Sequence, residues 1–269
     1  MIIANSLSAV KAMKKKIKEI CLLADIQDIG FCVFNAVKGH LLDCRAKSRI
    51  PEGAKTVIMC TFPYKVEENP PKNISRYAAV PDYHEVCGKM LEKAVELLRE
   101  NFKGNKFEYF LDNSPIPEVS AAATAGLGVK GDNGLLITKR WGSFVFLGEI
   151  VTDLEIECEN LYAECKHCGI CKSRCVVGLD KGRCLSMISQ KKGELNEREA
   201  ESLVENGSLW GCDICAEGCP HNVSVEKTYI KEFLEGYRDR YTAGEDNLGR
   251  AYNWRKGAIE RNYQLTIRN

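Results

Sequence analysis

The stretch CKHCGICKSRC, residues 165–175, places cysteines at positions 165, 168, 171 and 175. A second stretch, CDICAEGCP at residues 212–220, adds three more, and Cys184 lies between the two. Eight of the fourteen cysteines therefore fall within one short window, while the other six are scattered. Secreted domains that are held by disulfides are usually much shorter and spread their cysteines along the chain. The local gathering predicts that these thiols bind metal rather than pair as disulfides.

The first stretch has the C-x2-C-x2-C-x3-C spacing of bacterial ferredoxins, in which three cysteines hold one 4Fe–4S cluster and the fourth holds the other. Three closely spaced thiolates can wrap three corners of a cubane, and a distant residue must meet the remaining corner. We therefore expect two 4Fe–4S clusters with crossed ligands. The first takes Cys165, Cys168, Cys171 and Cys219, and the second takes Cys175, Cys184, Cys212 and Cys215.

Structural zinc is the alternative, because paired CxxC units also bind this ion in tetrahedral sites. The sequence departs from the ferredoxin motif in two places. Val176 stands where proline follows the first run, and the second run lacks its own first cysteine. A CxxCxxCxxxC run is nevertheless unusual for zinc, so iron–sulfur clusters are the favoured prediction. Cys158, His167 and His221 lie near the runs, and we expect none of them to be a ligand because eight thiols already suffice.

Composition excludes several other classes of protein. A hydrophobic fraction of 45% argues against disorder, and no apolar run reaches the roughly 20 residues that cross a bilayer. The N-terminus shows no signal peptide, so we expect a cytoplasmic protein in a reducing compartment with no membrane partner. The 38 basic and 37 acidic residues nearly cancel, which means that any contact with nucleic acid must be local.

The chain divides into three predicted parts. Residues 1–155 show helical and strand patterns in alternation and predict an α/β (α+β) N-terminal catalytic domain. Residues 156–228 carry the cysteines and predict a ferredoxin-like double 4Fe–4S domain, and residues 229–269 predict a helical tail. Two clusters transfer electrons but do not by themselves transform an organic substrate, so the first part is expected to hold the reactive centre.

Periodicity and capping residues predict the individual elements. Asp82 caps a helix and Gly207 closes another. Ser114 and Pro115 open a shorter helix that stops at Gly126, and a hairpin joins two strands at 134–138 and 143–152. The remaining helices are expected at 8–24, 82–101 and 196–206, and the remaining strands at 31–37, 56–62 and 107–111.

Several segments of the chain occur together in one protein family. They are RYA at 76–78, DNSP at 112–115, AGLG at 125–128 and GSFVFLGE at 142–149. In order and spacing, and with the cysteine runs that follow, they resemble the epoxyqueuosine reductase family over residues 30–222. The double-cysteine pattern alone is common among iron–sulfur proteins, whereas the other segments are more specific.

The resemblance implies a cobalamin-dependent iron–sulfur reductase that removes the epoxide oxygen of epoxyqueuosine in tRNA. Electrons would pass from a low-potential donor of the ferredoxin or flavodoxin type through the clusters to cobalamin. Asp112 matches the acid that protonates the leaving oxyanion, and we expect partial burial to raise its pKa for this role. The implied cobalamin contacts are Arg76, Tyr77, Gly128, Val129, Gly131, Asn133 and Ser143.

The chain departs from the family at Val129 and at Asp132-Asn133, where the family typically has an aromatic residue and a basic residue followed by histidine. It also stops at Asn269, so the resemblance is to a short form without the helical repeats of members that act on tRNA. Two other functions stay in competition: an electron carrier without cobalamin, and a reductase of a small molecule. From the residues alone, the favoured interpretation of Asp112 is a turn or capping aspartate.

Overall fold

The computed structural model describes residues 2–158, 165–244 and 255–267, apart from the side chains of residues 2–9 and 256. Its contacts form two compact units. The first unit comprises Met1–Phe62, Glu85–Lys139 and Val145–Cys165, and the second comprises Pro63–His84, Arg140–Phe144 and Lys166–Asn269. Two short segments that precede the cysteines in the sequence thus belong to the second unit. The predicted domain boundaries at 155 and 228 stay a prediction.

A four-stranded sheet forms the centre of the first unit. β1 pairs antiparallel with β2, with Val33 opposite Thr56, and β3 pairs antiparallel with β6, with Phe110 opposite Glu149. The mixed α/β architecture is confirmed, and the strands expected at 56–62 and 107–111 are correct to within one residue. The strand order is β1 (Asp28–Val33), β2 (Thr56–Pro63), β6 (Val145–Thr152) and β3 (Phe107–Phe110).

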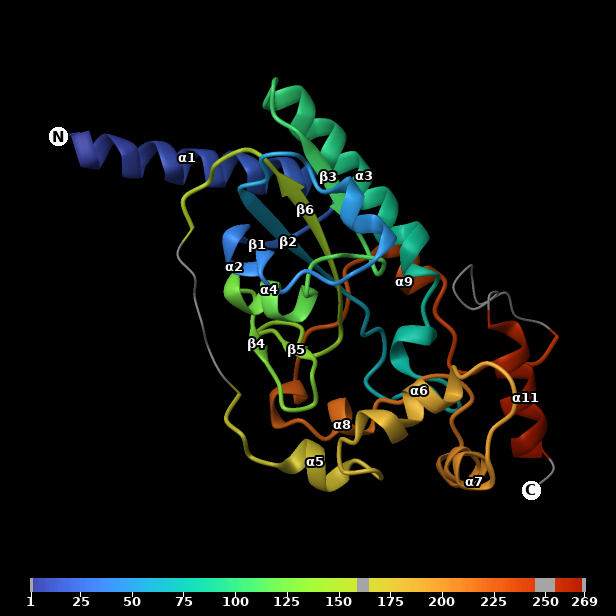
Figure 1. Cartoon of the computed structure of the whole chain (residues 1–269). Helices are drawn as coiled ribbons and strands as arrows, with labels where there is room; N and C mark the ends of the chain where they lie inside the picture. Colours follow the sequence, from blue (N-terminus) through green and yellow to red (C-terminus); the bar gives the residue numbers. More distant parts are fainter. Residues whose placement is uncertain (1, 159–164, 245–254, 268–269) are drawn as a thin grey trace. The chain divides into compact units, whose positions relative to one another are not determined.

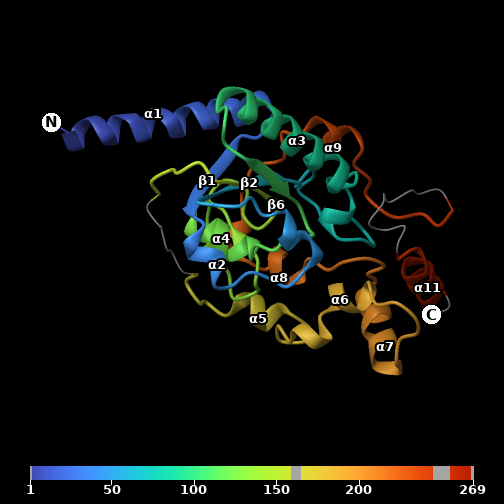
Figure 2. The same cartoon turned by 45° about the horizontal axis from the view of Figure 1, so that its top comes forward.

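Helices cover both faces of this sheet (Figures 1 and 2). Successive residues of a strand point to opposite faces, so Glu149 and Val151 of β6 share one face. On that face lie α2 (Asn35–Lys38) and α4 (Glu118–Thr124), and Ala121 of α4 belongs to one hydrophobic cluster with Val151. The carboxyl group of Glu149 therefore enters a mainly apolar layer.

The opposite face of the sheet carries the two long helices, α1 (Ile2–Leu23) and α3 (Tyr83–Asn101). Gly148 of β6 lets α3 approach closely, because a Cβ at this position would lie 2.8 Å from Cδ1 of Leu91. α3 begins as predicted after Asp82, whose carboxylate accepts a hydrogen bond of 2.9 Å from the backbone N–H of His84. This contact satisfies one of the free N–H groups at the start of the helix.

Two predicted elements of the first unit are shorter than expected. The strand expected at 31–37 ends at Val33, because the following residues turn into α2. The helix expected from Ser114 begins only at Glu118. The Ser114 hydroxyl accepts a hydrogen bond of 2.9 Å from the N–H of Ile116 and donates to a buried carboxyl, so it closes a turn instead of capping a helix.

The hairpin predicted between 134–138 and 143–152 is wrong. β5 (Leu136–Ile137) pairs instead with β4 (Val129–Lys130) in a separate two-stranded sheet. Gly128 permits this pairing, because a Cβ there would lie 2.4 Å from the carbonyl oxygen of Ile137. The segment between β5 and β6 belongs to the second unit, so it does not form a tight turn between them.

The second unit is built from short helices. The helix expected at 196–206 is confirmed: Asn196 and Glu199 form a reciprocal capping box, and Gly207 ends it with a φ of 60°. In the tail, Ile259 packs in one hydrophobic cluster with Trp210. Residues 245–254 and 268–269 of the predicted tail lie outside the described residues. The α-helices are α5 (Ile170–Arg174), α6 (Leu185–Ser189), α7 (Glu197–Asn206), α8 (Ile214–Glu217), α9 (Lys231–Glu235) and α11 (Lys256–Ile267).

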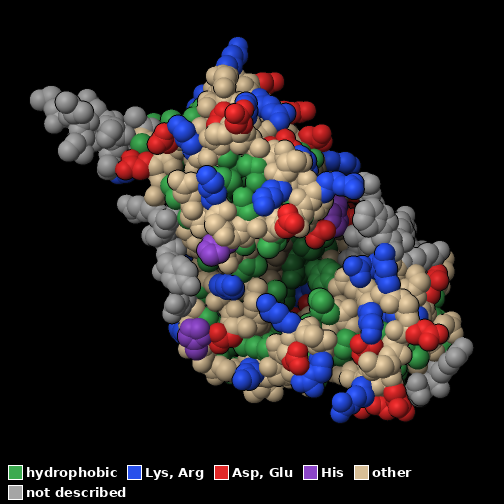
Figure 3. Space-filling view, viewed as in Figure 1, with side chains coloured by type: hydrophobic (Ala, Val, Ile, Leu, Met, Phe, Trp, Pro, Cys, Tyr) green, Lys and Arg blue, Asp and Glu red, His purple; other side chains and the backbone are tan. Residues whose placement is uncertain are grey.

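Four short 3-10 helices complete the list: η1 (Arg45–Arg49), η2 (Arg76–Ala78), η3 (Lys181–Arg183) and η4 (Pro220–Asn222). Charged side chains of both signs are interspersed over the face in Figure 3, in keeping with the balanced charge of the chain. Among the helices of the described residues, none combines the length and the apolar composition that a bilayer crossing requires.

Candidate functional site

The two cysteine runs lie on short helices that pack together. α5 carries Cys171, while α8 carries Cys215 and is followed by Cys219. The two helices contact each other, and a Cβ on Gly218 would lie 2.5 Å from Cδ of Arg174. The first cysteine run, on α5, and the second run, on α8, are therefore neighbours in the second unit.

The four thiols predicted for the second cluster influence one another's ionisation. Burial raises the pKa of Cys215 to about 12, and the thiols of Cys212, Cys175 and Cys184 add to the rise. Burial likewise raises the pKa of Cys212 to about 11, with Cys184 and Cys175 contributing. Three separate segments of the second unit thus bring these four thiols near one another.

The spacing of these four sulfurs differs from that of a tetrahedral zinc site. With Zn–S bonds of about 2.3 Å, the sulfurs of such a site lie about 3.8 Å apart. Within the described residues, no three of the four Sγ atoms lie within 4.8 Å of one another. The four described thiols are therefore not arranged as a compact tetrahedral zinc site.

The thiols predicted for the first cluster differ in exposure. Cys168 is exposed, whereas Cys171 and Cys219 are buried. These three belong to the second unit, and Cys165 is the last residue of the first unit. The backbone before α5 passes through the left-handed region at His167, with a φ of 51°, so this part of the run is curled rather than helical.

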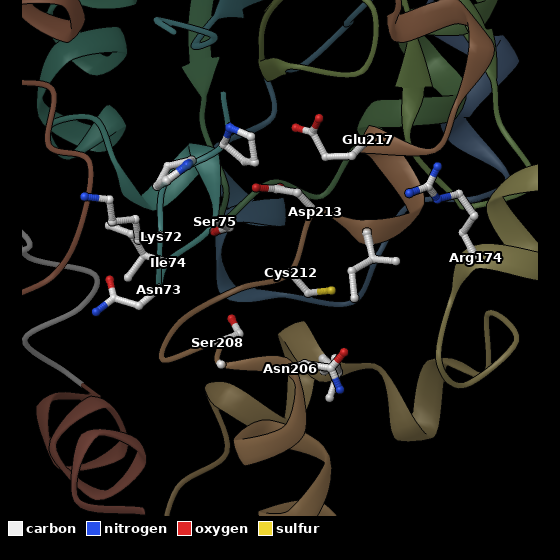
Figure 4. A pocket seen from close by; sticks show the side chains of 15 residues that line it. Lys72, Asn73, Ile74, Ser75, Arg174, Asn206, Ser208, Cys212, Asp213 and Glu217 are labelled. Atoms are coloured by element: carbon white, nitrogen blue, oxygen red, sulfur yellow. The ribbon is translucent and has the colours of Figure 1, made fainter. Parts of the chain in front are cut away.

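A pocket of about 290 Å³ opens beside the cysteines of the second unit (Figure 4). Cys212 lines it, together with residues that are next to the other three thiols of its set: Arg174, Leu185 and Ile214. Figure 4 shows the sulfur of Cys212 among the side chains around this pocket. The pocket therefore belongs to the surroundings of the predicted second cluster.

Arg76 is held firmly by its own unit. Its guanidinium pairs with the carboxylate of Glu217 and donates to the carbonyl oxygens of Glu67 and Glu68, each at 2.6 Å. The residue is only 3% exposed, and its backbone N–H donates to Asp213 at 2.6 Å. These contacts make Arg76 the anchor that joins the preceding loop to α8. Its contact with cobalamin stays a prediction.

Two other predicted cobalamin contacts, Tyr77 and Ser143, lie in the same unit. Burial raises the pKa of Tyr77 to about 12, and its hydroxyl accepts a hydrogen bond of 3.0 Å from Nε2 of Gln190. Ser143 is 3% exposed, and its Oγ has no hydrogen-bond partner within the described residues. A buried hydroxyl in this state costs about 1–3 kcal/mol, which a polar group of a ligand would recover.

The predicted cobalamin segment of the first unit, residues 128–133, forms β4 and a tight turn. The N–H of Gly131 donates a hydrogen bond of 2.8 Å to the carbonyl oxygen of Leu135, so Gly131 has a structural role in the turn. Val129 is partly exposed. Asn133 uses Oδ1 to accept from Leu135 at 3.2 Å, while its buried Nδ2 has no partner in the part of the chain that the structure describes.

Asp112 follows β3 directly and has a left-handed backbone, with a φ of 61°. The residue is exposed, so the expectation that it is partly buried is wrong. The left-handed turn takes Asp112 out of the sheet at the point where the strand ends. Its role as a proton donor stays a prediction.

Two carboxyl groups that sequence analysis missed lie beside this turn. Glu118, in the first turn of α4, accepts a hydrogen bond from the backbone N–H of Asp112. Glu149 of β6 is 0% exposed and accepts a hydrogen bond from the hydroxyl of Ser114. Burial, followed by the charge of Asp112, raises the pKa of Glu118 to about 8. Burial and the charge of Glu118 hold the pKa of Glu149 well above its ordinary value.

One signal in the sequence could have revealed the buried carboxyl of Glu149. It is the single charged residue in the apolar run FVFLGEIV at 144–151. A charge inside a strand that is otherwise apolar is expensive to bury, so its presence points to a specific environment.

Comparisons with known proteins agree with this architecture. A family model described as "Epoxyqueuosine reductase QueG, DUF1730" matches residues 46–113. A curated epoxyqueuosine reductase of Lactococcus garvieae is 30% identical over 259 residues, which cover 83% of this chain and 73% of that protein.

Solved structures extend the likeness to the fold. The epoxyqueuosine reductase of Streptococcus thermophilus has a TM-score of 0.78 at 23% identity, over 94% of this chain and 80% of that chain. A crystal structure of epoxyqueuosine reductase with an epoxyqueuosine-modified tRNA-Tyr stem loop also gives 0.78, at 21% identity over 96% of this chain and 81% of that chain. The fold described above is therefore shared with these structures.

Proposed function

Because this chain belongs to the epoxyqueuosine reductase family and is an oxidoreductase, we propose that it removes the epoxide oxygen of epoxyqueuosine by reduction. The observation that carries this proposal is the gathering of four cysteine thiols beside one pocket, in the unit that also anchors Arg76. An electron carrier without cobalamin and a reductase of small molecules are the alternatives that the experiment below separates.

The eight cysteines would hold two 4Fe–4S clusters. Their chemistry fits such a group, because four thiols of the second set come near one another without forming a compact zinc site. When bound, the clusters supply one-electron transfer at low potential. Cys165, Cys168, Cys171 and Cys219 would hold the first cluster, and Cys175, Cys184, Cys212 and Cys215 the second.

Polar groups without partners support binding of a cofactor that carries many amides, as cobalamin does. Oγ of Ser143 in the second unit is a buried polar atom of this kind, and it would bind a cobalamin amide, as would the hydroxyl of Tyr77 in the same unit. When bound, cobalamin supplies a cobalt centre that can be reduced and can then attack an electrophilic carbon.

Removal of an epoxide oxygen as water consumes two electrons and two protons, and Asp112 would supply the first of these protons. Opening an epoxide leaves an oxyanion on the substrate. The carboxylic acid of Asp112 would give its proton to this oxygen and become a carboxylate, which is general acid catalysis. Its exposed position supports the assignment, because a group on an open turn can reach a base that is presented by a large substrate.

A tRNA that carries epoxyqueuosine would be the substrate, since a similar fold has been solved with such a stem loop. The formal charge of +1 provides no general attraction for a polyanion, so recognition would rest on local contacts with the modified base and its neighbours. A low-potential protein of the ferredoxin or flavodoxin type would deliver the electrons.

Anaerobic reconstitution with iron, sulfide and cobalamin tests this proposal. With dithionite as reductant, we expect the protein to convert epoxyqueuosine to queuosine in a tRNA-Tyr stem loop. Cofactors bound without conversion of tRNA would point to a small-molecule substrate. Clusters that form while cobalamin fails to bind would indicate an electron carrier. Zinc in place of iron would contradict both the reductase and the electron carrier.

A further inference from the structure

Glu149 is fully buried in the first unit and Glu118 is partly buried, and each has one buried carboxyl oxygen without a hydrogen-bond partner among the described residues. Within the described residues, this holds for Oε1 of Glu118 and Oε2 of Glu149. Glu149 shares its face of β6 with Val151, which belongs to a hydrophobic cluster together with Ala121. An ionised carboxylate is costly in such surroundings unless a group compensates its charge.

The surroundings of the two glutamates favour the protonated form at neutral pH. Burial raises the pKa of Glu118 to about 8, and that of Glu149 lies well above its ordinary value for the same reason. The thiol of Cys32 on β1 belongs to the same hydrophobic cluster as Val151. Burial raises the pKa of this thiol to about 12, so it is neutral as well.

Two contacts tie these glutamates to the turn that carries Asp112. Glu118 accepts a hydrogen bond from the backbone N–H of Asp112, and the charges of the two side chains act on each other. Two residues further on, the hydroxyl of Ser114 donates a hydrogen bond to the carboxyl group of Glu149. The turn is therefore pinned at both points to a carboxyl group that holds a proton.

We propose that Glu118 supplies, through Asp112, the proton that the reductive opening of the epoxide consumes, and that Glu149 with Ser114 positions the turn for this transfer. The inference rests on the proposed function. It answers the problem that an exposed aspartate does not keep its own proton at neutral pH, since its ordinary pKa is about 3.9.

Removal of the epoxide oxygen as water takes two electrons, which the low-potential donor supplies, and two protons. Asp112 gives the first proton to the oxyanion of the opened epoxide, which becomes a hydroxyl group, and the second proton lets this group leave as water. The carboxylic acid of Glu118 then gives its proton to the carboxylate of Asp112, and water restores the proton of Glu118. A substrate that covers the turn removes water from Asp112 and raises its pKa, which brings the two carboxyl groups closer in proton affinity.

The pH dependence of turnover tests the role of Glu118. The rate of the reconstituted full chain should fall as pH rises through about 8, where Glu118 loses its proton. In Glu118→Gln the pH at which the rate of turnover falls should be lower by at least one unit. The rate at pH 7.5 should drop about tenfold or more. Glu96→Gln, an exposed glutamate on α3, serves as the matched control with an unchanged profile. A loss of rate that is equal at every pH, or an unshifted profile, would overturn the proposal.

A second measurement does not depend on activity and so separates this inference from the proposed function. The full chain labelled with ¹³C at glutamate Cδ should show a carboxyl signal that titrates near pH 8 and is missing in Glu118→Gln. In Asp112→Asn the midpoint of this signal should fall, because a negative neighbour is removed. Titration of Glu118 near its ordinary pKa of 4.5 would sink the inference even if the enzyme is active.

Discussion

The hydroxyl of Ser114 donates a hydrogen bond to the buried carboxyl of Glu149, and this contact joins the turn after β3 to the middle of β6. The same oxygen of Ser114 accepts a hydrogen bond from the backbone N–H of Ile116 at 2.9 Å. One hydroxyl therefore satisfies two buried polar groups, and the position of Asp112 depends on it.

Ser114→Ala should lower the free energy of unfolding by about 1–3 kcal/mol, because it leaves a buried acceptor and a buried donor without a partner. Urea unfolding followed by circular dichroism measures this. Ser48→Ala is the matched control, since the hydroxyl of Ser48 is exposed and donates only to the carbonyl of Arg45. A loss as small as that of the control would mean that the Ser114 contact contributes nothing.

The stability of the chain should depend on pH through Glu118. Its folded pKa of about 8 lies above the ordinary value of 4.5, so the folded state binds the proton more tightly than the unfolded state. This contribution is complete below pH 4.5 and is lost as pH rises towards 8. Unfolding measured across this range should therefore show a decline that is reduced in Glu118→Gln. An equal decline in both proteins would assign the effect to other groups.

Asp112→Asn should lower turnover by about 100- to 10,000-fold, because asparagine keeps the shape of the turn but cannot donate the proton. Binding of cobalamin, followed by its visible absorbance, should be unchanged. Asp25→Asn changes another exposed aspartate with a left-handed backbone and should keep full turnover. If Asp112→Asn turns over as fast as this control, Asp112 is not the donor.

Cys184→Ser should remove one ligand of the second cluster while the first cluster remains. Iron should fall from about eight to about four atoms per chain, with a matching loss of absorbance near 400 nm. Cys158→Ser should keep all the iron, since we expect that thiol not to be a ligand; its Sγ lies 2.9 Å from the carbonyl oxygen of Ile156. Iron lost from Cys158→Ser and retained in Cys184→Ser would reverse the two assignments.

Arg76→Ala should lower the free energy of unfolding by about 3 kcal/mol, because Glu217 and two backbone carbonyls lose their charged partner. Lys72→Ala provides the comparison. Its pair with Asp239 is more than half exposed on both sides, and such pairs contribute less than about 1 kcal/mol. Chemical denaturation of both variants decides whether Arg76 is the anchor that its contacts indicate.

The features predicted correctly are local ones. The helix over α7 could be predicted because its signals, Asn196, Glu199 and Gly207, lie within or next to it. Asp82 was found for the same reason, since a cap acts on residues two or three positions away. The cysteine spacing is local as well, and it pointed to the metal-binding segment without any knowledge of the fold.

The errors concern partners that are distant in the sequence. The apolar pattern of 134–138 indicates a strand but does not say which strand it pairs with, and β5 pairs with β4 rather than β6. Ser114 has the composition of a helix cap, yet its hydroxyl binds Glu149, which is 35 residues away. Burial of Asp112 could not be judged from its neighbours, because the left-handed turn exposes it.

The sequence by itself determined the class of the protein: spacing places thiols where a cluster can take them, and short segments carry the family resemblance. Only the tertiary structure decided how protons are held near the predicted donor. The pKa of a carboxyl group depends on the water and the charges within a few ångströms of it. Chain folding brings Glu118 and Glu149 to Asp112 from a helix and a strand, and no local pattern specifies that meeting.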